Sequence, residues 1–258
     1  MSLTNLFDLK NKVAIVTGGG NGIGKASALI LAQAGAAVAV SDLKLSDAEE
    51  VAEEIKKGGG KAIAVECNVT DDDHLVNLVE RTVKELGGVH ILINNAGGGG
   101  GGRESPFKID VKRFAWVFEL NLFSAWRLSQ LCAPHMKDGG YGSIVNITSM
   151  GSINKSPNMS AYAGSKAALN HMSANLAYDY GPFGIRVNCV GPGATKTAAL
   201  ASVLTPEIEE KMLAGTPIKR LGEVEDISGA VLYFAAPISE WVSGQVLFVN
   251  GGGVQTLD

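Results

Sequence analysis

Short apolar runs recur along the chain, separated by intervals long enough for one helix each. The runs are rich in Val and Ile and lie at residues 13–17, 36–42, 61–69, 89–95, 143–149, 185–193 and 245–252. They are continuous rather than alternating, which is typical of strands covered on both faces, as in a parallel sheet. The pattern therefore predicts about seven parallel strands.

Helical patterns fill the intervals. An alanine-rich segment at 24–34 stops at Gly35, a residue type favoured just after a helix. SDAE at 46–49 and TDDD at 70–73 match the capping box that begins a helix. Longer amphipathic segments follow at about 110–137, 161–180 and 224–236. Because strand and helix alternate, we expect one α/β domain over residues 1–258, a Rossmann-type doubly wound parallel sheet with helices on both faces.

Composition excludes several classes of protein. The 258 residues are 46% hydrophobic and have a net charge of −4, with Lys and Arg scattered, so neither a nucleic acid nor a membrane surface is an expected partner. No signal-peptide pattern or membrane-length apolar run is present. Three separated cysteines (67, 132 and 189) fit reduced thiols in the cytoplasm. The four histidines are unclustered, so we expect no metal site.

The first apolar run leads into a glycine-rich turn, TGGGNGIG at 17–24, which opens a helix. Backbone N–H groups at a helix N-terminus suit a pyrophosphate, although a tight strand-to-helix turn alone gives the same string. Asp42 ends the second run, where a carboxylate can bind ribose hydroxyls and repel a 2′-phosphate. Asp42 could equally be a solvated turn residue, and Lys44, two residues on, and Lys25, next to the glycine-rich turn, are cations that could serve NADP instead. The pattern favours NAD over NADP.

Six consecutive glycines, Gly97–Gly102, follow the fourth run. A flexible linker would explain them, but the alternation of strand and helix continues across them. Ligands of such sheets bind at the carboxyl ends of the strands. We therefore expect Asn95, Ala96 and Gly97 to line the cofactor path, where small side chains let a ligand approach the backbone. The following glycines would leave room for a broad, rigid substrate.

Four polar residues in the second half of the chain suggest catalytic chemistry. Tyr162 and Lys166 are four residues apart and share one helical face, although such pairs also occur on solvated helices. Ser149 ends the fifth run and could reach the same cleft or cap the next turn. Asn121 interrupts an apolar helical pattern, so it either satisfies a buried polar group or serves the site.

Together these features resemble the short-chain dehydrogenases/reductases. TGGGNGIG matches the family's TGxxxGxG, NNAG at 94–97 its motif after strand four, and YAGSK at 162–166 its YxxxK. The resemblance spans nearly the whole chain and implies Tyr162 as general acid or base and Ser149 as the group that polarises the carbonyl or alcohol. It implies that Lys166 binds the nicotinamide ribose and, with the positive nicotinamide ring, lowers the tyrosine pKa. Asn121 would support a water that links the lysine to solvent.

The resemblance also implies an NAD-binding set. It comprises Gly18, Asn21, Gly22, Ile23, Gly24, Asp42, Leu43, Asn68, Val69, Asn95, Ala96, Gly97, Tyr162, Lys166, Pro192, Gly193, Thr195 and Thr197. The family usually has Asp-Val where this chain has Asn68-Val69. An asparagine oxygen can still accept a hydrogen bond from the adenine amino group.

Several stretches outside the cofactor site are similar to bacterial hydroxysteroid dehydrogenases, among them LSQLCAPHM at 128–136, TPEIEEKML at 205–213 and WVSGQ at 241–245. This similarity implies oxidation of the 7α-hydroxyl of a bile acid to a ketone, in a homotetramer. The expected substrate-binding residues are Gly99, Ser149, Asn154 and Tyr162, although Asn154 could simply form a turn.

The segment at about 194–223 has the Ala, Leu and Met content of a lid over an apolar ligand, but a core-packing helix would have the same content. The same catalytic residues would serve a sugar, a polyol or a 3-oxoacyl thioester. A non-catalytic NAD-binding scaffold is the alternative from another class of protein.

Overall fold

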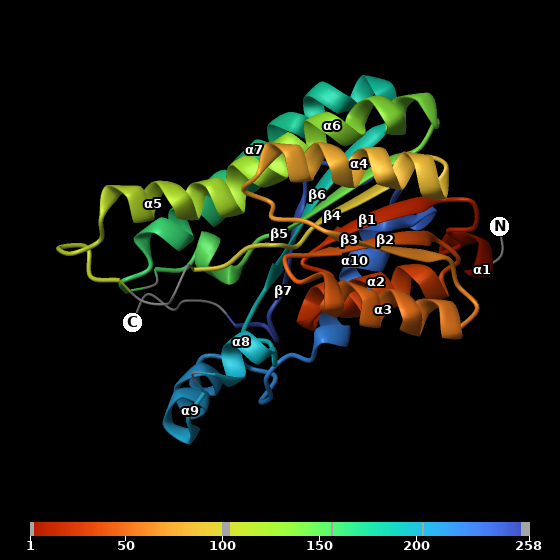
Figure 1. The fold of residues 1–258 in the computed structure, drawn as a ribbon. Coiled ribbons are helices and arrows are strands. Elements are labelled where there is room, and N and C mark those ends of the chain that lie inside the picture. Colours follow the sequence, from red (N-terminus) through yellow and green to blue (C-terminus); the bar gives the residue numbers. More distant parts are fainter. Residues whose placement is uncertain (1–2, 100–103, 156, 203, 254–258) are drawn as a thin grey trace.

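The computed structural model describes residues 3–99, 104–155, 157–202 and 204–253. Within them, seven strands form one sheet in the order β3-β2-β1-β4-β5-β6-β7, and every neighbouring pair is parallel (Figure 1). The strands are β1 (Val13–Thr17), β2 (Ala37–Asp42), β3 (Ala62–Glu66), β4 (Ile91–Asn94), β5 (Gly142–Ile147), β6 (Ile185–Pro192) and β7 (Val246–Val249). The predicted doubly wound α/β fold is confirmed.

Helices cover both faces of the sheet. In Figure 1, α2, α3 and α10 lie on one face, and α4, α6 and α7 on the other. The helices are α1 (Leu3–Leu6), α2 (Gly22–Gln33), α3 (Leu45–Lys57), α4 (Asp72–Leu86), α5 (Val111–Phe118), α6 (Ser124–Asp138), α7 (Ser160–Tyr180), α8 (Ala198–Ala201), α9 (Pro206–Ala214) and α10 (Val224–Ala235). No helix of the described residues is long and apolar enough to cross a membrane.

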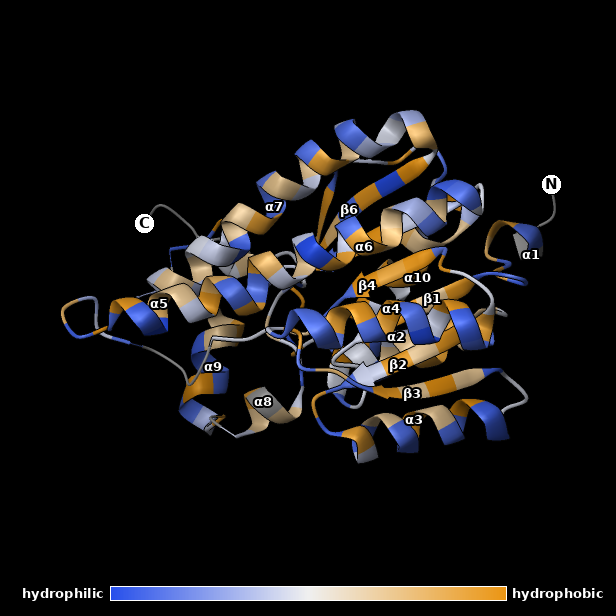
Figure 2. Ribbon diagram, turned by 45° about the horizontal axis from the view of Figure 1, so that its top comes forward, coloured by the Kyte–Doolittle hydropathy of each residue, from blue (hydrophilic) through white to orange (hydrophobic). Residues whose placement is uncertain are grey.

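The two-sided covering explains the continuous apolar runs. In β1, Ala14 and Val16 belong to the core on the α2/α3/α10 side, whereas Val13 and Ile15 belong to the core on the α4/α6 side. Burying a Val or Ile side chain contributes about 1.5–3 kcal/mol. The residues that face one side of the strand and those that face the other are therefore both apolar. Figure 2 shows the result as apolar strands between helices that are polar outside.

Both capping boxes predicted from sequence are wrong. Helix α3 begins two residues earlier than predicted, with Lys44 as its N-cap and no side-chain cap, so Ser46 lies inside it. Helix α4 is capped by Asp71, whose carboxylate accepts hydrogen bonds from the N–H groups of Asp73 (3.0 Å) and His74 (3.3 Å). A carboxylate is a stronger acceptor than the hydroxyl of Thr70, which bonds elsewhere. The predicted stop at Gly35 is confirmed, with φ of 102°.

The amphipathic segment expected at about 110–137 is not one regular helix. Helices α5 and α6 are joined by a π-helical turn at Glu119–Phe123. Such turns insert one extra residue into a helix and are frequent at functional sites. Here the turn contains Asn121, which is 2% exposed. The asparagine that disturbed the apolar pattern therefore lies at a distortion of the helix.

Candidate active site

The carboxyl ends of the strands surround a cavity of about 860 Å³. All the site residues predicted from the sequence line it except Gly24, Asn121 and Asn154. The residues come from the loops after β1, β2, β3, β4, β5 and β6 and from α7. The sheet thus brings together groups that are up to 179 residues apart in sequence, Gly18 and Thr197 being the furthest.

In the turn after β1, some glycines are needed for their positive φ and another because a side chain would have no room. Gly18 and Gly22 have φ of 59° and 54°, in the left-handed region where side chains are strained. Gly24 does not line the cavity; a Cβ there would lie 2.0 Å from the carbonyl oxygen of Gly18. Its role is therefore to let α2 pack against the turn, which sets the position of the helix N-terminus.

Replacing Gly24 by Ala is expected to destabilise the protein by about 1–3 kcal/mol and to weaken NADH binding, because the overpacked turn must move. Gly229→Ala is the matched control: it also lies in a helix, and a Cβ there meets nothing within 4 Å. That change should stabilise the protein by about 0.5–1 kcal/mol. Chemical denaturation and NADH titration of both variants would check this, and equal stability of the two would contradict it.

Asp42 is fixed beside the glycine turn. Its carboxylate accepts hydrogen bonds from the N–H groups of Gly20 (3.0 Å) and Lys44 (3.3 Å). Lys25, one of the two nearby cations, is paired instead with Glu54 (2.8 Å). Asp42 therefore lines the cavity, and its bond with Lys44 also closes a local turn.

Asn68 lines the cavity, but its oxygen is already engaged. The oxygen accepts hydrogen bonds from the N–H of Thr70 (3.1 Å) and from its hydroxyl (2.8 Å). A carbonyl oxygen has two lone pairs, so an adenine amino group would have to displace one of these bonds, and the adenine contact stays a prediction. The two bonds have a local cause, the Asn-x-Thr sequence, in which the asparagine closes its own turn.

Ser149 and Tyr162 lie together at the centre of the cavity. The Ser149 oxygen accepts a hydrogen bond from the N–H of Gly151 (3.0 Å), and a Cβ on Gly151 would lie 3.4 Å from that oxygen and 3.5 Å from the Tyr162 ring. Burial raises the pKa of Tyr162, and a hydrogen bond with Ser149 offsets part of that rise. In the protein alone, the phenol is therefore held in its neutral form.

Lys166, one turn further along α7, is buried and donates a hydrogen bond to the carbonyl of Ile147 (2.8 Å). Burial lowers the pKa of its ammonium to about 8, and the nearby Cys189 opposes that lowering. A Cβ on Gly97 would lie 3.1 Å from Nζ, so the missing side chain of this glycine gives the ammonium its space.

Asn121 does not line the cavity, but it holds Gly98, which does. Its amide forms two hydrogen bonds with the backbone of Gly98, accepting from the N–H and donating to the carbonyl, both at 2.9 Å. It also donates to the hydroxyl of Ser165 (3.1 Å), which in turn donates to the carbonyl of Tyr162 (2.8 Å). The amide thus joins the start of the glycine run to α7. Gly100–Gly102 lie outside the described residues.

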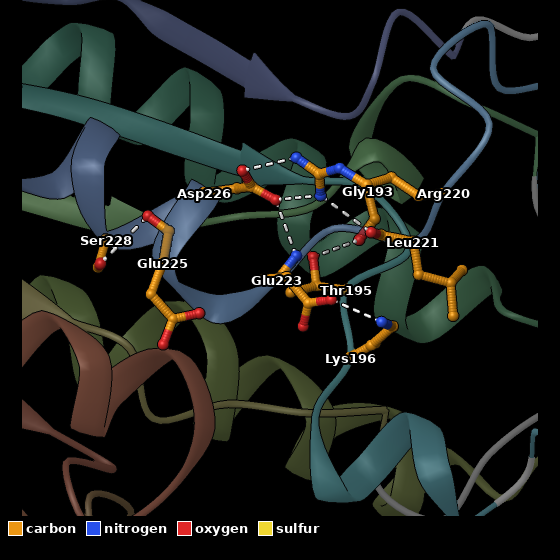
Figure 3. Close-up of polar contacts among 9 residues, drawn as sticks. All are labelled: Gly193, Thr195, Lys196, Arg220, Leu221, Glu223, Glu225, Asp226 and Ser228. Carbon is orange, nitrogen blue, oxygen red and sulfur yellow. Dashed lines mark hydrogen bonds and ion pairs between the residues drawn. The ribbon is translucent and has the colours of Figure 1, made fainter.

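The ends of the segment predicted as a lid are fastened together. Thr195 and Gly222 form an isolated parallel bridge, and the Lys196 ammonium pairs with Glu223 at 2.5 Å (Figure 3). Arg220 pairs with Asp226 at the start of α10 (Figure 3). Among the residues of this segment that the structure describes, those that line the cavity lie in its first part, between Ala194 and Leu200. Helix α9 does not line it: its Leu213 borders a separate cavity of about 190 Å³.

Asn154 lies outside the cavity lining, and its N–H bonds to the carbonyl of Met150 (2.9 Å), which closes a turn. Conversely, several residues that were not predicted from the sequence do line the cavity, among them the apolar Trp116, Leu120 and Met159. The spacing of four residues between the first two marks a shared helical face. Periodicity cannot tell whether such a face meets a core or a cavity.

The chain matches known proteins over almost its full length. The family model described as enoyl-(acyl carrier protein) reductase matches residues 18–253. A 7α-hydroxysteroid dehydrogenase of Escherichia coli is 50% identical over 250 residues, 97% of each chain.

Solved structures agree. A 7α-hydroxysteroid dehydrogenase complexed with NADH and 7-oxo glycochenodeoxycholic acid superimposes with a TM-score of 0.95, at 48% identity over 100% of both chains. A short-chain type dehydrogenase/reductase from Mycobacterium marinum gives a TM-score of 0.91 at 32% identity, covering 97% of this chain and 98% of its own. With the three sequence motifs at one cavity, these matches show that the chain belongs to the short-chain dehydrogenase/reductase family.

Proposed function

We propose that the protein transfers a hydride between NAD and a secondary alcohol or ketone, and that its substrate is the 7α-hydroxyl of a bile acid. The observation that supports this most strongly is the cavity itself, in which Ser149, Tyr162 and Lys166 lie next to an apolar outer part. The 50% identity to a 7α-hydroxysteroid dehydrogenase supports the same substrate.

The residues at the strand ends fit a dinucleotide. A Cβ on Gly18 would lie 3.0 Å from the Asn95 amide, so this glycine lets the turn pack against the loop after β4. The N-terminus of α2, with Gly22 and Ile23, then borders the cavity where a pyrophosphate would lie. Asp42 would hold the adenosine ribose, and Lys166 the nicotinamide ribose. When bound, NAD supplies the hydride chemistry; the protein's part is to orient the reacting groups and exclude water.

Asp42 sets the preference for NAD over NADP by repelling a 2′-phosphate. Asp42→Ala is expected to raise kcat/KM with NADP relative to NAD by roughly tenfold or more, an effect of about 1–3 kcal/mol for an unscreened charge pair in a partly buried site. Steady-state kinetics with both cofactors would check this. A wild-type protein that already prefers NADP would contradict the assignment, whatever the variant does.

In this proposal Tyr162 exchanges the proton of the substrate oxygen, and Ser149 donates a hydrogen bond to that oxygen. Gly151 occupies one lone pair of Ser149 and thereby orients its hydroxyl. Since burial raises the pKa of Tyr162, the phenolate needs added positive charge, which Lys166 and the bound oxidised cofactor would supply. Asn121 keeps the Gly98 backbone and α7 in register, and the segment at about 194–223 serves as a lid.

We also propose a homotetramer in the cytoplasm. Exposed apolar side chains on α7 and β7, such as Tyr178 (85% exposed) and Leu247 (40%), would be covered by neighbouring subunits. Cys67, Cys132 and Cys189 are free and buried, consistent with a reducing compartment. Light scattering coupled to size exclusion tests the assembly.

A panel of secondary alcohols with NAD, followed by NADH absorbance, tests the substrate class. The panel contains hydroxysteroids, a polyol, a sugar and a 3-hydroxyacyl thioester. A kcat/KM on the hydroxysteroids well above that on every other member is the expected result. Preference for the thioester would favour the activity named in the matching family model, and no turnover on any member would favour a non-catalytic scaffold.

A further inference from the structure

The outer part of the cavity contains one large aromatic side chain that the chemistry above does not use. Trp116, on α5, is 40% exposed and lines the same cavity as Ser149 and Tyr162. Leu120, four residues on, lines it too, as does Met159 from the loop before α7. An exposed indole that borders a cavity, rather than open surface, is available to a ligand.

Trp116 is held in place from outside the cavity. The guanidinium of Arg113, one helical turn earlier, lies 4.8 Å from the centre of the indole ring, within the range of a cation–π contact. Arg113 is itself fixed by an ion pair with Glu104, at 3.1 Å. Both charged side chains are partly exposed, so this ion pair adds little to the stability of the fold. Its main effect is to fix the position of the Arg113 guanidinium against the indole.

Glu104 connects the ion pair with Arg113 to the loop before α7. Its backbone N–H donates a hydrogen bond to the carbonyl of Asn158, at 2.7 Å. Asn158 has φ of 59° and directly precedes Met159. The segment after the glycine run and the loop before α7 are therefore tied together beside Trp116, and the outer wall of the cavity is pre-arranged.

The other side of α5 anchors the helix to the body of the protein. Val117 is buried, and Phe114 stacks on Phe118 with ring centroids 5.2 Å apart. A Cβ on Gly164 of α7 would lie 3.5 Å from Phe118, which places that ring against α7, the helix of Tyr162 and Lys166. The indole is consequently a rigid part of the site and not a loosely attached surface residue.

We propose that Trp116 is a specificity-determining residue whose braced indole selects rigid multi-ring alcohols over small ones. A flat aromatic face suits an alicyclic skeleton because it buries a large apolar area without losing much side-chain entropy. A small alcohol bound at Ser149 and Tyr162 would not extend to this wall. The inference rests on the proposed function, since it concerns the substrate of that same site.

The test compares kinetics of Trp116→Ala and wild type on chenodeoxycholate and on cyclohexanol, with NAD. We expect KM for the bile acid to rise on the order of tenfold or more, as for a lost apolar contact in a pocket. The kcat, the KM for NAD and the kinetics on cyclohexanol should stay within about twofold of wild type, since the catalytic groups remain. Arg113→Gln should give a smaller rise in the same direction.

Trp126→Ala is the matched control, because Trp126 is 44% exposed on α6 and does not line the cavity. It should leave KM for the bile acid unchanged. The inference is overturned if Trp116→Ala leaves that KM within twofold, or if it impairs cyclohexanol and NAD equally. A wild-type protein that oxidises cyclohexanol but not the bile acid would instead contradict the proposed substrate, so the two failures are distinguishable.

A binding measurement completes the test. With Trp126 and Trp241 replaced by Phe and Tyr162→Phe added to prevent turnover, Trp116 is the only fluorescent indole. Saturating chenodeoxycholate with NAD present should change its emission. Unchanged emission, with binding established by calorimetry, would place the ligand away from Trp116 and overturn the inference.

Discussion

Tyr162→Phe is expected to lower kcat/KM for the alcohol by about 10²–10⁴ while NADH still binds, because a positioned general acid or base contributes that much. The variant keeps the ring that fills its buried place on α7 and removes only the hydroxyl beside Ser149. Stopped-flow or steady-state kinetics and a fluorescence titration with NADH would measure the two effects separately.

Tyr233→Phe is the control for this result, since Tyr233 lies on α10 and does not line the cavity. It should leave both activity and binding unchanged. The wild-type rate of alcohol oxidation should also fall as the pH falls, because burial favours the protonated phenol, which cannot accept the proton. Activity of Tyr162→Phe within tenfold of wild type would remove Tyr162 from the mechanism.

Lys166→Met is expected to move activity and stability in opposite directions. Turnover should fall at least about a hundredfold, because the positive charge that favours the phenolate is lost. Stability should rise: a pKa of about 8 in place of 10.5 for the ammonium means that burial of its charge costs about 3 kcal/mol at neutral pH. Since Met also abandons the hydrogen bond to Ile147, we expect a gain of about 1–3 kcal/mol.

The pH dependence of stability independently checks the predicted sign of the Lys166→Met effect. Between pH 8 and 10.5 the unfolded chain holds a proton on Lys166 that the folded protein has released, so this group makes the wild type more stable as the pH rises. The advantage of Lys166→Met should therefore shrink over that range. Chemical denaturation at several pH values measures it, with the exposed Lys57→Met as control. A variant less stable than wild type at pH 7 would contradict the account.

Most of the fold could be predicted because the physics is local and repeated. Strands buried on both faces are apolar at most positions, so runs such as 13–17 stand out without any other information. The glycines of the first turn are equally visible, since Gly18 and Gly22 occupy the left-handed region and Gly24 has no space for a Cβ. Each of these constraints acts through the residue's own neighbourhood.

The features that could not be predicted from the sequence depend on which of several similar residues forms a given contact in the fold. Thr70 and Asp71 can both cap α4, and Asp71 does so because Thr70 bonds to Asn68. The π-helical turn at Asn121 has no propensity signal of its own in the sequence. Its asparagine bonds to Gly98, a residue from a distant segment of the chain. Trp116 looked like any aromatic residue of an amphipathic helix until the fold placed a cavity beside it.

The central claim is that the protein oxidises the 7α-hydroxyl of bile acids with NAD, and one comparison tests it most directly. Initial rates of NADH formation are measured with chenodeoxycholate, with cholate and with deoxycholate, which lacks the 7-hydroxyl. The account predicts turnover of the first two and none of deoxycholate beyond the rate without substrate. Equal rates on all three, or turnover of deoxycholate alone, would contradict it.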